Sequence, residues 1–262
     1  MVAATLLVWW TLALGAPLPE VEALSVVARV EGSPTPVRLR GALGQAETSR
    51  AQRETSRVVA DVGRRFLQPV AAAAHPPVDL CLFETEPAYV AFTTRVCGPI
   101  PDCSPLGFYQ PGRRLIVANL GRSIGNLRHE LAHALIGDDF PGIPAWLNEG
   151  IGALYGTAKF DGKSFGFAVN YRMRDVKAAL AAGTLPTLAQ LARSNEQDVY
   201  GPRAMVYYGL ARHLLLYLDQ QNKLSAFYRA MRDDAHTVDA QTALLAATVD
   251  EKAFLEWVRK QK

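Results

Sequence analysis

The sequence predicts an α+β fold in which a small mixed sheet with helices comes first and a mainly helical half follows. Short apolar runs bounded by Pro and Gly dominate residues 24–120, whereas apolar residues at helical spacing dominate residues 123–262. Strands therefore come early and helices late, an order that favours α+β over an alternating parallel architecture. The 262 residues suffice for one large domain or two small ones. We expect an N-terminal α+β subdomain over 21–120 and a helical subdomain over 121–262.

The N-terminal half contains the expected strands and two of the expected helices. The strands are predicted over 24–30, 36–39, 78–83, 107–109 and 114–120. The first two flank the turn-forming segment GSPTP and form a hairpin, and the last two are joined by Gln110-Pro111-Gly112. The helices are predicted over 46–70 and 86–95.

The C-terminal half reads as a succession of helices. They are predicted over 123–136, 144–155, 171–182, 185–193 and 203–219, followed by two closing helices up to Lys262. The segment from Gly137 to Gly142 is expected to be a loop that lets the chain turn back after the first of these helices.

The first sixteen residues have the character of an export signal. MVAATLLVWWTLALGA is apolar, uncharged and ends in small residues, as the hydrophobic region of a signal peptide does. It is shorter than the roughly 20 apolar residues of a spanning helix, so no stable membrane span is expected after cleavage. A buried N-terminal helix is the alternative. We expect an exported protein, periplasmic or secreted.

Net charge and cysteines set further limits. The formal charge is +3 with scattered basic residues, which excludes an obvious nucleic-acid surface. Export would permit a disulfide between Cys97 and Cys103, which flank a Pro/Gly loop, and would leave Cys81 as a buried thiol. No cysteine has a CxxC partner, so the cysteines are not expected to bind a metal.

A metal-binding motif lies at the start of the helical half. Residues 128–133 read RHELAH, which contains H-E-x-x-H within an amphipathic helical stretch. His129 and His133 are four residues apart, so both imidazoles lie on one helix face and can bind the same ion. Glu130 lies where a carboxylate can reach a water at that ion. A tetrahedral catalytic zinc needs a third protein ligand, and the sequence offers Glu149 or Asp139.

HELAH followed by AWLNEGIGALY resembles the gluzincin, or peptidase MA-like, families of zinc metallopeptidases. In those families a W-x-x-E-G or N-E-G helix supplies the glutamate ligand, so the resemblance implies His129, His133 and Glu149 as the zinc ligands. Asp139 has the spacing of the metzincin-like third ligand, but Ile136 stands where those families carry glycine. The resemblance favours Glu149 and implies a zincin-like fold.

The same families place a tyrosine on a later helix, directed at the oxyanion of the reaction. The run Y-G-L-A-R-H-L-L-L-Y-L matches that pattern and implies this role for Tyr208, with Tyr207 and then Tyr200 as less favoured candidates. An aromatic core stripe is the competing interpretation.

The expected function is zinc-dependent hydrolysis of peptide bonds, with Glu130 as general base and a peptide or protein as substrate. The short spacing between His133 and Glu149 favours an endopeptidase. A strand such as 114–118 is expected to lie at a sheet edge and to pair with an extended substrate. The alternative is an exported zinc-containing binding or structural protein with a zincin fold and little or no turnover.

Overall fold

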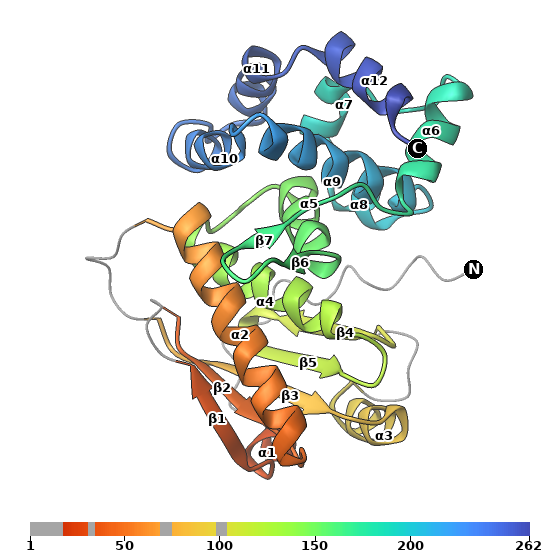
Figure 1. The fold of residues 1–262 in the computed structure, drawn as a ribbon. Helices are drawn as coiled ribbons and strands as arrows, with labels where there is room; N and C mark the ends of the chain where they lie inside the picture. Colours follow the sequence, from red (N-terminus) through yellow and green to blue (C-terminus); the bar gives the residue numbers. More distant parts are fainter. Residues whose placement is uncertain (1–17, 31–34, 69–74, 98–103) are drawn as a thin grey trace. The chain divides into compact units, whose positions relative to one another are not determined.

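The computed structural model describes residues 18–30, 35–68, 75–97 and 104–262 and shows an α+β protein with a small mixed sheet and mostly helices (Figure 1). The chain divides into two compact units, Met1–Asp139 and Phe140–Lys262. The helix that carries H-E-x-x-H closes the first unit, and the helix that carries Glu149 opens the second. The predicted signal peptide, 1–16, lies outside the described residues.

The first unit is built on a five-stranded sheet with the order β1-β2-β3-β5-β4. Its strands are β1 (Val26–Val30), β2 (Val37–Arg40), β3 (Val78–Phe83), β4 (Gly107–Gln110) and β5 (Leu115–Asn119). β2, β3 and β5 are parallel to one another, whereas β1 and β4 pair antiparallel at the two edges. The sheet is therefore mixed, as predicted.

β4, not β5, is the edge strand at this end of the sheet. The expectation that residues 114–118 form an edge is wrong, because β5 lies between β3 and β4 and all five of its residues are buried. In the register of β4 and β5, the Asn119 amide donates to the Leu106 carbonyl, and Gly107 and Tyr109 fall at the alternate, non-hydrogen-bonded positions. Their amide and carbonyl groups therefore face the outer side of the sheet.

Helices cover both faces of this sheet. α1 (Pro19–Glu22) and α3 (Glu86–Cys97) pack on one face, where Val21 and Phe92 join the odd-numbered side chains of β3 and β5 in one apolar cluster. α2 (Gln45–Arg65) and α4 (Ile124–Asp139) contact each other and cover the other face. Successive side chains of a strand point to opposite faces, so β3 and β5 each contribute side chains to the helix layers on both sides of the sheet.

α4 is longer than predicted. It continues through Gly137, Asp138 and Asp139, so the loop expected from Gly137 is wrong and the connection begins at Phe140. A glycine inside a helix is tolerated at a cost of about 1 kcal/mol. Here the two aspartates that follow are held by residues of the first unit, as described below, and this fixes the last turn.

The second unit contains eight helices and a small hairpin. They are α5 (Ala145–Gly156), β6 (Lys159–Phe160), β7 (Phe165–Gly166), α6 (Met173–Ala181), α7 (Leu188–Ala192), α8 (Glu196–Tyr200), α9 (Ala204–Gln220), α10 (Leu224–Asp233), α11 (Val238–Thr248) and α12 (Glu251–Lys260). Three helices close the chain where two were expected, and α8 and the hairpin were not predicted. α9 is the centre of the unit, because α5, α6, α8 and α10 all contact it (Figure 1).

α5 and α9 approach each other closely at Gly150. A Cβ atom at this position would lie 2.7 Å from Leu215 Cδ1 and 3.3 Å from Ala211. On the same helix Trp146 is fully buried, with its ring 6.4 Å from that of Phe227. The glycine that follows Glu149 therefore permits the contact that sets the position of α5 against α9.

Two further expectations concern the cysteines and the membrane. Cys81 is a free, buried thiol, and burial raises its pKa to about 12. Cys97 is disulfide-bonded, and Cys103 lies outside the described residues. Within the described part of the chain, no helix combines the length and apolar character needed to cross a lipid bilayer.

Candidate metal centre

The two histidines of the motif lie one turn apart on α4, with their ring planes perpendicular to each other. The Nε2 atoms of His129 and His133 are 2.9 Å apart, and the ring centroids are 4.5 Å apart. Two nitrogens bound to one tetrahedral zinc would be about 3.3 Å apart. His133 is buried and His129 is half-buried. Both rings therefore present the same nitrogen to one point.

The C-terminal turn of α4 is held by a half-buried ion pair. Arg114 donates two hydrogen bonds to Asp138, of 2.7 and 2.8 Å, and the Thr35 hydroxyl donates a third. Burial opposes ionisation of Asp138, but the hydrogen bonds from Arg114 and Thr35 hold the pKa of this carboxyl below its usual range. Asp138 is thus a charged anchor for the helix that carries both histidines.

Asp139, the alternative third ligand, has another role. Its Oδ1 accepts a hydrogen bond of 3.0 Å from the Gln68 backbone amide, which ties the end of α4 to the segment after α2. Among the described residues, the group that could hold a metal contains Glu149 and not Asp139. This agrees with the ligand set that the family resemblance favours.

Glu149 lies near the start of α5 and is buried. Pro144 precedes the helix in an extended conformation and the Leu147 and Asn148 amides bond back to its carbonyl, so Glu149 falls in the first turns. Its Oε1 accepts a hydrogen bond of 2.9 Å from the Tyr200 hydroxyl, and its Oε2 is enclosed by protein. Tyr200 therefore fixes one oxygen of the carboxylate.

One ligand atom from each of His129, His133 and Glu149 lies within 4.8 Å of the other two, so these residues could hold a metal ion together. Two imidazoles and one carboxylate are a donor set that suits zinc, with a fourth position left open for water or substrate. The residues fit the ion that the motif implies.

Glu130 lies beside this group on α4 and is half-buried. Burial, and after it the negative charge of Glu130, raises the pKa of the Tyr89 hydroxyl. That hydroxyl donates to the Ser104 carbonyl, just before the edge strand β4. Glu130 and the Tyr89 hydroxyl are therefore near enough to interact electrostatically.

The adjacent tyrosines of α9, Tyr207 and Tyr208, have different neighbours. Tyr208 packs edge-on against Tyr200, with ring centroids 6.3 Å apart, and the Arg172 guanidinium lies 5.3 Å from its ring centre. Tyr207 is buried, its pKa is raised by that burial, and the Arg203 guanidinium lies 5.9 Å from its ring centre. Tyr208 is half-buried and, through Tyr200, closely linked to Glu149.

Tyr200 contacts the candidate ligand Glu149, a role that the sequence did not predict, because it offered this tyrosine only as a less favoured oxyanion donor. It ends α8, a helix of only five residues with no readable apolar period. The available signal was Asn195 followed three residues later by Asp198, whose side chains and amides bond reciprocally in a capping box. That pattern predicts a helix start, and hence a fixed direction for the tyrosine at its end.

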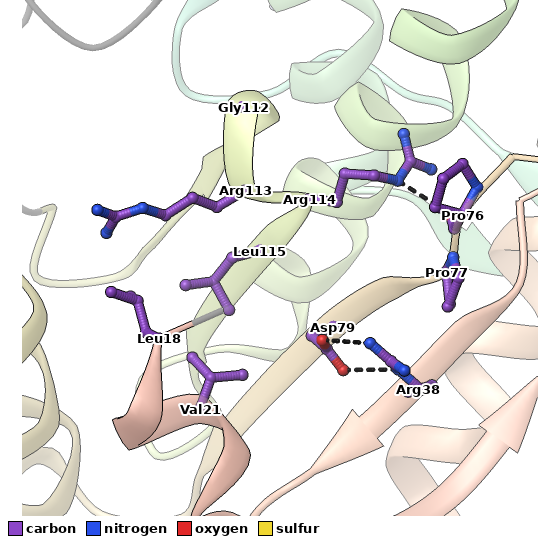
Figure 2. Close-up of a pocket in the computed structure, with 10 residues that line it drawn as sticks. All are labelled: Leu18, Val21, Arg38, Pro76, Pro77, Asp79, Gly112, Arg113, Arg114 and Leu115. Atoms are coloured by element: carbon purple, nitrogen blue, oxygen red, sulfur yellow. Dashed lines mark hydrogen bonds and ion pairs between the residues drawn. The ribbon is translucent and has the colours of Figure 1, made fainter. Parts of the chain in front are cut away.

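A cavity of about 250 Å³ in the first unit lacks the features of a functional site. Arg38 and Asp79 in its wall bind each other through two hydrogen bonds, of 2.9 and 2.7 Å, and Arg114 donates to the Pro76 carbonyl (Figure 2). Figure 2 also shows Arg113 extended away from the Arg38 and Asp79 pair. The polar groups of the cavity wall therefore do not converge on a common ligand.

Comparison of the chain with protein-family models and with curated proteins finds no match. The interpretation of the site therefore depends on its chemistry: the paired imidazoles, the carboxylate of Glu149 and the acid between the histidines.

Proposed function

We propose that this protein is a zinc-dependent peptidase of the gluzincin type with a zincin-like fold. The observation that carries the proposal is the grouping of His129, His133 and Glu149 within 4.8 Å, with Glu130 on the same helix as the histidine pair. A structural zinc site needs four protein ligands, whereas this group has three and adds an acid that is not a ligand. That combination is typical of hydrolysis.

When bound, zinc lowers the pKa of a coordinated water to about 7 and polarises the scissile carbonyl. Glu130 accepts a proton from the attacking water and then transfers it to the departing amine as the C–N bond breaks. The products are a carboxylate and a free amine.

The two tyrosines take different parts in this proposal. Tyr200 positions Glu149 through its 2.9 Å hydrogen bond, in the way that outer-shell partners fix metal ligands. Tyr208, the neighbour of Tyr200, donates its phenolic hydrogen bond to the oxyanion that develops on the substrate. A donor to charge that exists only in the transition state accelerates the reaction.

The substrate is a peptide or exported protein, bound as an added strand at β4. The amide and carbonyl groups of Tyr109 face outward from this edge, as main-chain pairing requires, whereas Gly107 is buried. The pairing strand is thus moved from residues 114–118, which lie inside the sheet, to Gly107–Gln110. The apolar leader over 1–16 supports export to the periplasm or the exterior.

The test is a metal analysis combined with an activity assay. Wild-type protein and the Glu130→Gln variant are purified, their zinc content is measured, and both are incubated with casein and a peptide library. We expect close to one zinc per chain in both proteins and cleavage by the wild type alone, because the amide side chain of the variant cannot accept a proton. His129→Ala and Glu149→Ala should retain less zinc.

The same experiment decides between the proposal and its alternative. Equal zinc in both proteins with no cleavage by either would instead support an exported zinc-containing binding or structural protein. Absence of zinc from wild-type protein prepared in zinc-supplemented medium would contradict both.

A further inference from the structure

A surface of the second unit close to Glu149 combines a cation with exposed apolar side chains. Arg172 precedes α6, and its guanidinium lies 5.3 Å from the ring centres of both Tyr171 and Tyr208. Its Nη1 lies 3.4 Å from the Met205 sulfur, which is a weak acceptor. We call Tyr171, Arg172, Met205 and Tyr208 the Arg172 patch.

The charge of Arg172 is not balanced by an acid. Within the described parts of the chain, the contacts of its guanidinium are the two rings and the sulfur, and no carboxylate lies within ion-pair distance. The neighbouring Arg174 differs, since it is exposed and pairs with Asp175 at 3.4 Å. Arg172 is therefore held in place without a partner of opposite charge.

A second arginine adds to this excess of positive charge. Arg212 is fully buried and donates to the carbonyls of Ala153 and Ala168 and to the Thr157 hydroxyl. Burial, and after it the charge of Arg172, lowers the pKa of Arg212 to about 10. Two like charges thus act on each other in a part of the unit where an anion would relieve their repulsion.

The patch also has the composition of a binding surface. Tyr171 is 62% exposed and Met205 is 48% exposed, although most large apolar side chains of this unit are buried. Tyr, Met and Arg are enriched at interfaces, where an apolar surround strengthens an ion pair by excluding water.

The patch is connected to the metal ligand by direct contacts within the second unit. Tyr208 touches Tyr200, and the Tyr200 hydroxyl donates to Glu149. Arg172 directly precedes α6, Tyr200 ends α8 and Glu149 lies in α5. All three helices contact α9 (Figure 1). Through these contacts the guanidinium lies within about five residues' length of an extended peptide from the Glu149 carboxylate.

From these observations we infer that Arg172 binds a carboxylate of the substrate, so that the preferred substrates are peptides with an acidic group within about five residues of the cleaved bond. This inference rests on the proposed function and specifies its substrate class. The carboxylate belongs either to an Asp or Glu side chain or to the free C-terminus, and both give the planar, two-oxygen partner that arginine binds through paired hydrogen bonds.

The test measures binding separately from cleavage. Zinc-loaded Glu130→Gln protein is titrated with three fluorescent peptides of one apolar sequence: one with a Glu and an amidated C-terminus, one neutral with a free C-terminus, and one neutral and amidated. We expect at least one of the carboxylate peptides to bind about 10-fold or more tightly than the neutral amide. Which of them does so identifies the source of the carboxylate.

Variants in the same background assign the preference to one arginine. Arg172→Met should abolish it, whereas Arg174→Met, the matched control two residues away, should retain it. Arg172→Lys keeps the charge but loses the paired geometry, so it should retain a reduced preference. This variant also serves if Arg172→Met does not fold.

Equal binding of all three peptides by the Glu130→Gln protein, or an equal loss in the Arg172 and Arg174 variants, would overturn the inference. Failure of the proposed function looks different: wild-type protein would then cleave none of the peptides while the Glu130→Gln protein still preferred the acidic ones.

Discussion

Replacing Gly150 by alanine tests whether the contact between α5 and α9 positions the glutamate of the metal centre. The added Cβ would lie 2.7 Å from Leu215 Cδ1, so this methyl must move by about 0.7 Å to reach the 3.4 Å of an ordinary contact. Leu215 is fully buried, and the second close contact, at 3.3 Å, involves the backbone of Ala211. Neither neighbour can retreat freely.

Two opposing effects set the magnitude of this change. Alanine gains about 1 kcal/mol over glycine in a helix interior. Overpacking a close contact costs about 1–3 kcal/mol. We expect Gly150→Ala to lower the free energy of unfolding by about 1 kcal/mol and zinc affinity by about 10-fold, because any separation of α5 from α9 also displaces the adjacent Glu149 from Tyr200.

Gly137→Ala is the matched control, because Gly137 also lies in a helix of the metal centre but a Cβ there would meet nothing within 4 Å. It should raise the free energy of unfolding by about 0.5–1 kcal/mol. Urea unfolding followed by far-ultraviolet circular dichroism measures both variants, and competition with a chromophoric chelator measures zinc affinity. If Gly150→Ala stabilised the protein as much as Gly137→Ala does, the role given to this contact would be refuted.

Three further predictions concern other residues of the two units. Tyr200→Phe removes the hydrogen bond to the glutamate ligand and should weaken zinc binding by about 10- to 100-fold in chelator competition, whereas Tyr217→Phe, in an aromatic cluster of the same unit, should not. Asp138→Asn leaves its arginine partner half-buried without a counter-charge and should lower the free energy of unfolding by about 2–3 kcal/mol; an unchanged urea midpoint would contradict the anchoring role. His213 is fully buried, and burial lowers its pKa from 6.5 to about 4, so the unfolded chain takes up the proton first as the pH falls. The contribution of the neutral His213 ring to the free energy of unfolding is complete above about pH 6.5 and decreases toward pH 4. Between pH 7 and pH 5 the free energy of unfolding falls by about 2 kcal/mol. His213→Gln should reduce this pH dependence and replacement of the exposed His236 by Gln should leave it in place; equal slopes in all three apo proteins would count against the assignment.

Local patterns in the sequence were sufficient to predict the elements that form the site. The strand over Val78–Phe83 has the predicted bounds, and the H-E-x-x-H spacing alone predicts that both imidazoles share one helix face. Glu149 could be proposed because a proline, a helix start and a glutamate follow one another within six residues. Each of these features depends on residues close together in the chain.

Features that depend on distant parts of the chain were predicted less well. The edge strand was misjudged, although the apolar run over 115–118 is typical of an interior strand and the mixed Gly107–Gln110 of an edge. α4 was ended too early because Gly137 suggested a stop, whereas Arg114 and Gln68, both distant in sequence, hold its last turn. The hydrogen bond from Tyr200 to Glu149 was not predicted, because it joins residues distant in sequence and α8 is too short to show an apolar period.

The placement of the anchors explains why the histidine pair can be rigid although its helix contains a glycine. Asp138 binds Arg114 at the start of β5, and Asp139 binds the Gln68 amide, so the helix end is tied to the sheet on one side and to the segment after α2 on the other. Directly before His129, Arg128 donates to Glu54 of α2 at 3.0 Å. These contacts therefore hold α4 on both sides of the histidine pair along the helix. A helix held in this way supplies the preorganised ligands that the proposed catalysis requires.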